Sequence, residues 1–107
     1  MIKVTIGDSQ RVFASRSDIE EAWINQQIVR RRRDTGEDPC VRVHVALGSV
    51  DVTFASASCG GQGGGGRALT PLESSLFDLW QQFELGGRAL VGGRLVEFLK
   101  RAFLMVA

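Results

Sequence analysis

Histidine, cysteine and long apolar runs are scarce in this chain, and each scarcity excludes a class of function. His44 is the only histidine, so no cluster of histidine, cysteine and carboxylate is spaced to hold a metal. No stretch reaches the roughly 18 consecutive apolar residues of a membrane span. The first residues also lack the basic start and apolar run of a secretory signal. We therefore expect a cytoplasmic protein with no cofactor and no membrane contact.

An excess of charge of one sign is also lacking. The 107 residues carry 13 basic and 12 acidic side chains, a formal net charge of +1. This balance argues against a surface that binds nucleic acid as a whole, but it leaves room for a local basic patch. Apolar residues make up 44% of the chain and include six Phe and two Trp. That is enough for a single domain over residues 1–107 with a core of its own.

Alternating apolar and polar residues predict the strands. Residues 2–6 form a half-buried strand, and residues 11–14 form a short second strand that pairs back onto it. Two further alternating runs, 40–47 and 50–56, flank the dipeptide Gly48-Ser49. A two-residue loop that begins with glycine suits a type II′ hairpin.

The register of this hairpin follows from the same alternation. Only one pairing puts every apolar residue on one face: Leu47 with Val50, Val45 with Val52, and Val43 with Phe54. The polar residues then share the other face: Arg42, His44, Asp51 and Thr53.

The two cysteines lie near the open end of this hairpin. If both strands extend that far, Cys40 and Cys59 are diagonal neighbours with Cβ atoms roughly 7 Å apart. That distance is too long for an unstrained disulfide without local movement. Two cysteines are also too few for a disulfide framework, and we expect free thiols in a reducing cytosol.

Helical periodicity predicts three helices. The first begins at Ser17, which forms a capping box with Glu20, and ends near Arg33, before Gly36 and Pro39. Its predicted core stripe is Ile19, Ala22, Trp23 and Val29, while Ile24 and Ile28 lie off that stripe.

The second helix begins at Pro71, after a capping box of Thr70 and Glu73, and ends at Gly86-Gly87. Its predicted core face is Leu72, Leu76, Leu79, Trp80 and Phe83. The side chains expected to face away are Glu73, Ser74, Asp78, Gln81 and Gln82.

The third helix runs from about Arg94 to the C-terminus, with 88–91 as a short piece before it. It has a narrow polar strip of Arg94, Glu97, Lys100 and Arg101, and it is otherwise almost entirely apolar. An apolar surplus of this kind serves either a shared core or a docking face. A docking face that includes Leu99 and Phe103 would make a homodimer seam.

The predicted fold class is α+β, with three to four antiparallel strands packed by three helices. The element order is strand, short strand, helix, two strands, a glycine-rich loop at 58–68, and two helices.

The glycine-rich loop has two interpretations. It lacks the Lys and Ser/Thr of a nucleotide-binding P-loop, because Arg67 and Ala68 stand in their places. The simpler interpretation is a flexible linker. The other is an anion-binding nest formed by the backbone of Gly63, Gly64 and Gly65 beside Arg67 and the start of the following helix.

The sharpest charge feature is a run of four arginines: Arg30, Arg31, Arg32 and Arg33. Positive charge at a helix C-terminus is favourable, so a solvated helix end explains the run without a ligand. The alternative is a contact with phosphate or with an acidic partner, in which Arg42 takes part. RNA binding would usually add aromatic side chains on the polar sheet face, and there are none.

Two hypotheses of function remain. His44 is a diagonal neighbour of Asp51, but no nucleophile accompanies the pair, so we expect no catalytic residue and no enzyme. The leading hypothesis is a small non-catalytic protein–protein interaction module, such as an inhibitor, adaptor or immunity-type partner. The alternative is a binder of anions or RNA that uses the four arginines and the loop Gly60–Arg67.

Overall fold

A computed structural model describes residues 1–60, 68–84 and 92–106, except for the side chains of residues 83 and 84. In chain order the elements are β1 (Ile2–Ile6), β2 (Ser9–Phe13), the 3₁₀ helix η1 (Arg16–Asp18), α1 (Glu21–Thr35), β3 (Val41–Leu47), β4 (Val50–Ala55), the 3₁₀ helix η2 (Ala57–Cys59), α2 (Pro71–Glu84) and α3 (Gly92–Val106). The predicted α+β class, with an antiparallel sheet and three helices, is confirmed.

The four strands form one sheet in the order β2-β1-β3-β4, and every neighbouring pair is antiparallel. The predicted hairpin register is confirmed in full, from Leu47 opposite Val50 to Val43 opposite Phe54. Gly48 has a φ of +57°, the positive sign that the first position of a type II′ turn requires. β2 begins two residues before the predicted 11–14, because Gly7 and Asp8 alone make the turn.

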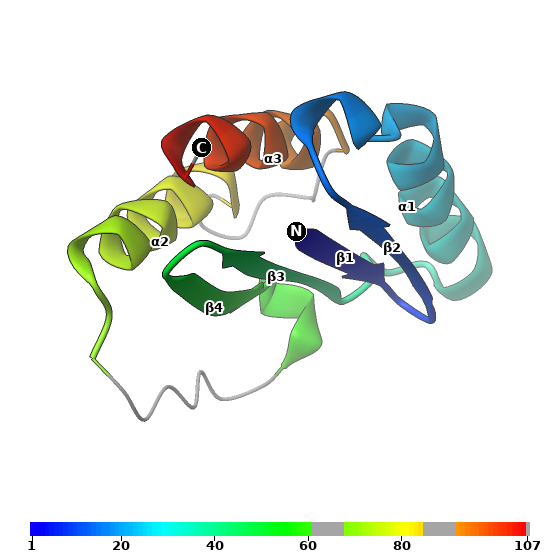
Figure 1. The fold of residues 1–107 in the computed structure, drawn as a ribbon. Coiled ribbons are helices and arrows are strands. Elements are labelled where there is room, and N and C mark those ends of the chain that lie inside the picture. Colours follow the sequence, from blue (N-terminus) through cyan, green and yellow to red (C-terminus); the bar gives the residue numbers. More distant parts are fainter. Residues whose placement is uncertain (61–67, 85–91, 107) are drawn as a thin grey trace.

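All three helices cover one face of the sheet, with α3 lying between α1 and α2 (Figure 1). The residues that the sheet turns toward the helices are buried: Ile2, Val4, Ile6, Phe13, Val41, Val43, Val45, Val50 and Phe54. An aromatic group from three elements fills the region under α2 and α3, where the ring centroids of Phe54, Trp80 and Phe98 lie 5.0 to 5.8 Å apart.

The start of α1 differs from the prediction. The helix begins at Glu21, whereas Ser17 lies in η1. Asp18 makes the local contacts instead, because its Oδ2 accepts the backbone N–H of Ser15 at 3.1 Å. The end of α1 is close to the predicted one, since Gly36 takes a left-handed conformation just past the last turn.

The predicted core stripe is right for Trp23 and for Ile19, which packs against the core just before α1, but it is wrong for Ala22 and Val29. Val29 is 59% exposed and Ala22 is exposed, while Ile24 and Ile28 are buried beside Trp23. The reason is that α1 packs against two neighbours at once, β1 and α3. The strip of α1 that faces both of them is centred on Ile24 and Ile28.

α2 has the predicted start, because Thr70 and Glu73 form the capping box in both directions. The expectation that Glu73 faces solvent is wrong, since its side chain is fully buried. In α3, Leu99 and Phe103 are core residues, so they do not form the predicted docking face. The apolar side chains that α3 exposes are Leu104 and Met105. The side chain of Phe83, the predicted stop at Gly86-Gly87 and the short piece at 88–91 lie outside what the structure describes.

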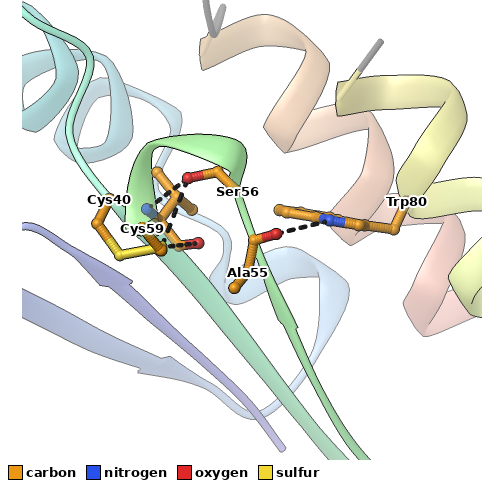
Figure 2. Close-up of a disulfide and its surroundings, with 6 residues drawn as sticks. Cys40, Ala55, Ser56, Cys59 and Trp80 are labelled. Carbon is orange, nitrogen blue, oxygen red and sulfur yellow. Dashed lines mark hydrogen bonds between the residues drawn. A yellow bond between two sulfur atoms is a disulfide. The ribbon is translucent and has the colours of Figure 1, made fainter. Parts of the chain in front are cut away.

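The expectation of free thiols is wrong, because Cys40 and Cys59 form a disulfide with Cα atoms 4.4 Å apart (Figure 2). The strand geometry assumed for Cys59 ends at Ala55. The chain then turns through η2 and returns toward the start of β3. Ser56 secures this turn, since its buried Oγ accepts the backbone N–H of Val41 at 2.9 Å.

Candidate functional site

The face of the sheet that points away from the helices is not covered by any described element (Figure 1). We call it the outer sheet face. Its side chains are exposed or half-buried and mostly polar: Lys3, Thr5, Gln10, Arg42, His44, Asp51 and Thr53, with Val12, Ala46 and Ala55 as the apolar ones. This composition is that of a solvated surface or a recognition surface rather than of a second core layer.

His44 and Asp51 form the ion pair that the hairpin register allows, with Nε2 of His44 2.6 Å from Oδ1 of Asp51. Both side chains are open to solvent, and Thr53 stands directly opposite His44 on β4. The pair lies on an open sheet face rather than in a cleft. A catalytic pair would require a site that excludes water, and this open face does not exclude it.

Lys3 and Arg42 are the cations of the outer sheet face that form no ion pair with any described residue. They come from the two central strands, where Lys3 is opposite His44 and Arg42 is opposite Thr5. Sequence reasoning singled out Arg42 but not Lys3. The alternation of residues 2–6 places Lys3 on the polar side of its strand, but only the pairing of β1 with β3 brings the two cations together.

The two edges of the sheet differ. In an antiparallel sheet, alternate residues of an edge strand point their backbone groups outward. On β4, α2 supplies partners for two of these groups. Oε2 of Glu73 accepts the N–H of Asp51 at 3.0 Å, and Nε1 of Trp80 donates to the carbonyl of Ala55 at 3.3 Å (Figure 2).

The β2 edge carries no such cover among the described residues. Gln10, Arg11 and Val12 are all exposed, and Val12 keeps 51% of its surface in contact with solvent. Arg11 turns back toward the core side, where it pairs with Glu20 at 3.0 Å and lies over the ring of Trp23. The outer sheet face together with the β2 edge is the candidate site.

The four arginines at 30–33 do not act as one patch. Arg31 reaches the turn between β1 and β2, where it pairs with Asp8 at 3.4 Å and its guanidinium lies against Gly7. Arg32 pairs with Asp38 at 2.5 Å, and both side chains are partly buried. These two arginines therefore tie α1 to its neighbouring turns.

Arg30 and Arg33 point to the outside of α1. They line a shallow depression with Asn25, Gln26, Gln27 and Val29. Arg33 lies 3.8 Å from Asp34, and Arg30 forms no ion pair with a described residue. Two cations beside three side-chain amides can bind an anion, and this is the part of the arginine run that is available for it.

The remaining predicted site residues are separated from this depression. Arg42 lies on the outer sheet face, whereas α1 covers the inner one. Gly63, Gly64, Gly65 and Arg67 lie outside the described residues. The residues just before this stretch are held in place, because Cys59 is bonded to Cys40 and Gly60 caps η2.

Within the described residues, no three side chains of His, Cys, Asp or Glu come together as metal ligands would. None of the described helices has the length and apolar character to cross a membrane. No protein-family model, no curated protein and no solved structure matches the chain. The function must therefore be argued from the surfaces themselves.

Proposed function

We propose that the protein is a small, non-catalytic protein–protein interaction module of the inhibitor, adaptor or immunity type, and that its docking surface is the outer sheet face. One observation carries this proposal. The helices cover one side of a four-stranded sheet, while the other side presents two cations, Lys3 and Arg42, that form no ion pair with a described residue, and an edge that no described element covers. A sheet whose backbone is held by its own hydrogen bonds loses little backbone entropy when a partner docks on it.

The charge of this surface indicates the partner. Lys3 and Arg42 form no ion pair with any described residue, and Asp51, the acidic side chain of this face, is already in contact with His44. A partner with carboxylates at its contact would complement both cations, which favours fast association and a defined orientation.

Site-specific photocrosslinking in cells that make the protein tests the proposal. A crosslinker at Thr53 reports on the outer sheet face, and one at Glu97, exposed on α3, serves as the control. We expect discrete crosslinked products from position 53 that disappear in Arg42→Glu and persist in the charge-matched variant Arg101→Glu. Products that do not depend on Arg42, or that form equally from position 97, would overturn the proposal.

A second candidate function is anion binding at the depression on α1, which its pair of arginines and its amides favour. A titration with inorganic phosphate and then a short RNA, followed by backbone NMR at low and moderate salt, tests it. Binding there should shift the amides of Arg30 and Arg33 and weaken steeply with salt. Arg30→Gln should abolish these shifts, while Arg101→Gln should leave them unchanged. An unchanged spectrum would exclude this second function.

A further inference from the structure

The hydrogen-bond pattern of the sheet shows which backbone groups of β2 are free. Met1 exchanges both of its backbone bonds with Ala46, and the N–H of Gly7 donates to Cys40. The odd-numbered residues of β1 therefore bond to β3. Its even-numbered residues bond to β2, where they face Ser9, Arg11 and Phe13. The backbone groups of Gln10 and Val12 consequently point out of the sheet.

These groups meet no described partner. The open stretch ends at Ala14, whose N–H donates to Oδ2 of Asp18 at 3.2 Å, and at the turn formed by Gly7 and Asp8. Between these limits, Gln10 and Val12 offer two donors and two acceptors in the alternating order that an added antiparallel strand uses. The opposite edge differs, because Glu73 and Trp80 occupy two of its outward groups.

The side chains along this edge indicate the chemistry of the added strand. Val12 and Lys3 are cross-strand neighbours on the outer sheet face, and Gln10 stands in one row with Thr5 and Arg42. Each of the two rows that begin at the open edge thus leads to a cation without an ion-pair partner. An added strand would lie two strand spacings, about 10 Å, from the backbone of Lys3 and about 14 Å from that of Arg42. With a Debye length of about 8 Å at physiological salt, its carboxylates would feel Lys3, whose long side chain shortens that distance, far more than Arg42.

We propose that the β2 edge binds an extended, acidic segment of a partner protein by antiparallel strand addition. The proposal rests on the interaction function above and names the binding mode and the partner chemistry. Gln10 and Val12 make the backbone bonds. Val12 contacts an apolar side chain of the partner, while Lys3 attracts its carboxylates.

A second copy of this chain fits the edge less well. The register that would use all the free groups of two β2 strands places Arg11 of one copy opposite Arg11 of the other, and like charges directly opposite are unfavourable. The outer side of β2 also presents Gln10 and Val12, neither of which complements a cation.

The test uses a short synthetic peptide that alternates Val and Glu, with blocked ends, added to the intact protein. We expect this peptide to slow amide hydrogen exchange at Gln10 and Val12. A control peptide that alternates Val and Lys should bind at least about tenfold more weakly. Peptide that carries a methyl group on every backbone nitrogen should not bind, because neither of its edges can then donate to the ladder. This last control requires no change in the protein.

Variants then assign the site. Val12→Pro removes an outward N–H that β1 does not use, so it should abolish binding at an edge where proline is tolerated. Val12→Thr keeps the N–H and the β-branched shape and should bind normally. Slowed exchange at Thr53 instead of Gln10, equal binding of the N-methylated peptide, or protection caused by dimerisation would overturn strand addition.

The two proposals fail in different ways. Crosslinks from position 53 without any peptide effect would leave the interaction function standing and remove the strand-addition mode. Absence of both would remove both.

Discussion

Glu73 connects the start of α2 to the edge strand β4: its Oε1 accepts the N–H of Thr70 at 3.0 Å, and its Oε2 accepts the N–H of Asp51 at 3.0 Å. One fully buried carboxylate thus caps a helix and covers part of a sheet edge. Thr70 completes the arrangement, since its Oγ1 accepts the N–H of Glu73 at 3.2 Å. This connection makes the β4 edge different from the β2 edge.

Glu73→Ala should therefore lower the free energy of unfolding by about 1–3 kcal/mol, because two backbone N–H groups lose a buried carboxylate acceptor. Chemical denaturation of the variant measures the loss. Asp78→Ala, an exposed acidic position on the same helix, is the matched control and should change stability by less than about 0.5 kcal/mol. Equal midpoints for the two variants would show that the Glu73 contacts contribute nothing.

Trp80 has two separable roles, and two substitutions distinguish them. Trp80→Phe keeps an aromatic ring beside Phe54 and Phe98 but loses the donor to Ala55, so it should cost about 1 kcal/mol. Trp80→Ala also opens a cavity in the aromatic group and should cost about 3–5 kcal/mol. Thermal or chemical denaturation gives both values. A similar cost for the two variants would mean that the indole N–H, rather than packing, dominates.

The strands could be predicted because their pattern allows few alternatives. Moving the pairing of 40–47 with 50–56 by one residue would put Val43 and Phe54 on opposite faces of the sheet, so alternation alone determines the register. The faces of α1 were harder to predict, because its apolar residues form two adjoining stripes. The choice of Ile24 and Ile28 over Val29 depends on where α3 lies, which no local pattern contains.

The burial of Glu73 and the β2 edge escaped prediction for a related reason. A helical wheel counts Glu73 as polar and turns it outward, but its partner, the N–H of Asp51, comes from another element. The open edge depends on strand order, which places β2 rather than β1 at the margin of the sheet. The arginine run was visible in the sequence. The sequence did not show that Arg31 and Arg32 form ion pairs with neighbouring turns while Arg30 and Arg33 point outward.

The disulfide between Cys40 and Cys59 should stabilise the fold by about 3 kcal/mol, because it closes a loop between residues 19 apart in the chain. Denaturation with and without a reductant measures this contribution, with Ser58→Ala as a control in the same turn. Thiol titration of the unfolded, unreduced protein should find no free thiol. Two reactive thiols would contradict the pairing.

The cytoplasmic location remains a prediction. Persistent disulfides are rare in reducing compartments, so the same thiol titration on freshly isolated protein tests it: two free thiols would agree with a reducing compartment, and none would argue against it.

The adjacent residues Gly92 and Gly93 at the start of α3 should respond oppositely to alanine. A Cβ on Gly92 would meet the side chain of Asn25 from α1, whereas a Cβ on Gly93 would meet nothing within 4 Å. Gly93→Ala should stabilise by a few tenths of a kcal/mol to about 1 kcal/mol through helix propensity. Gly92→Ala should be less stable than Gly93→Ala by about 1–3 kcal/mol, because the packed helices have to separate or Asn25 has to move.

A double variant identifies the cause of this difference. If the Asn25 side chain is the obstacle, Asn25→Ala combined with Gly92→Ala should recover most of the loss, since the truncated side chain leaves room for the new methyl group. Unfolding free energies of the two single variants and the double variant form a complete thermodynamic cycle. Additive effects would mean that Gly92 does not contact Asn25 and that α1 and α3 pack differently at this point.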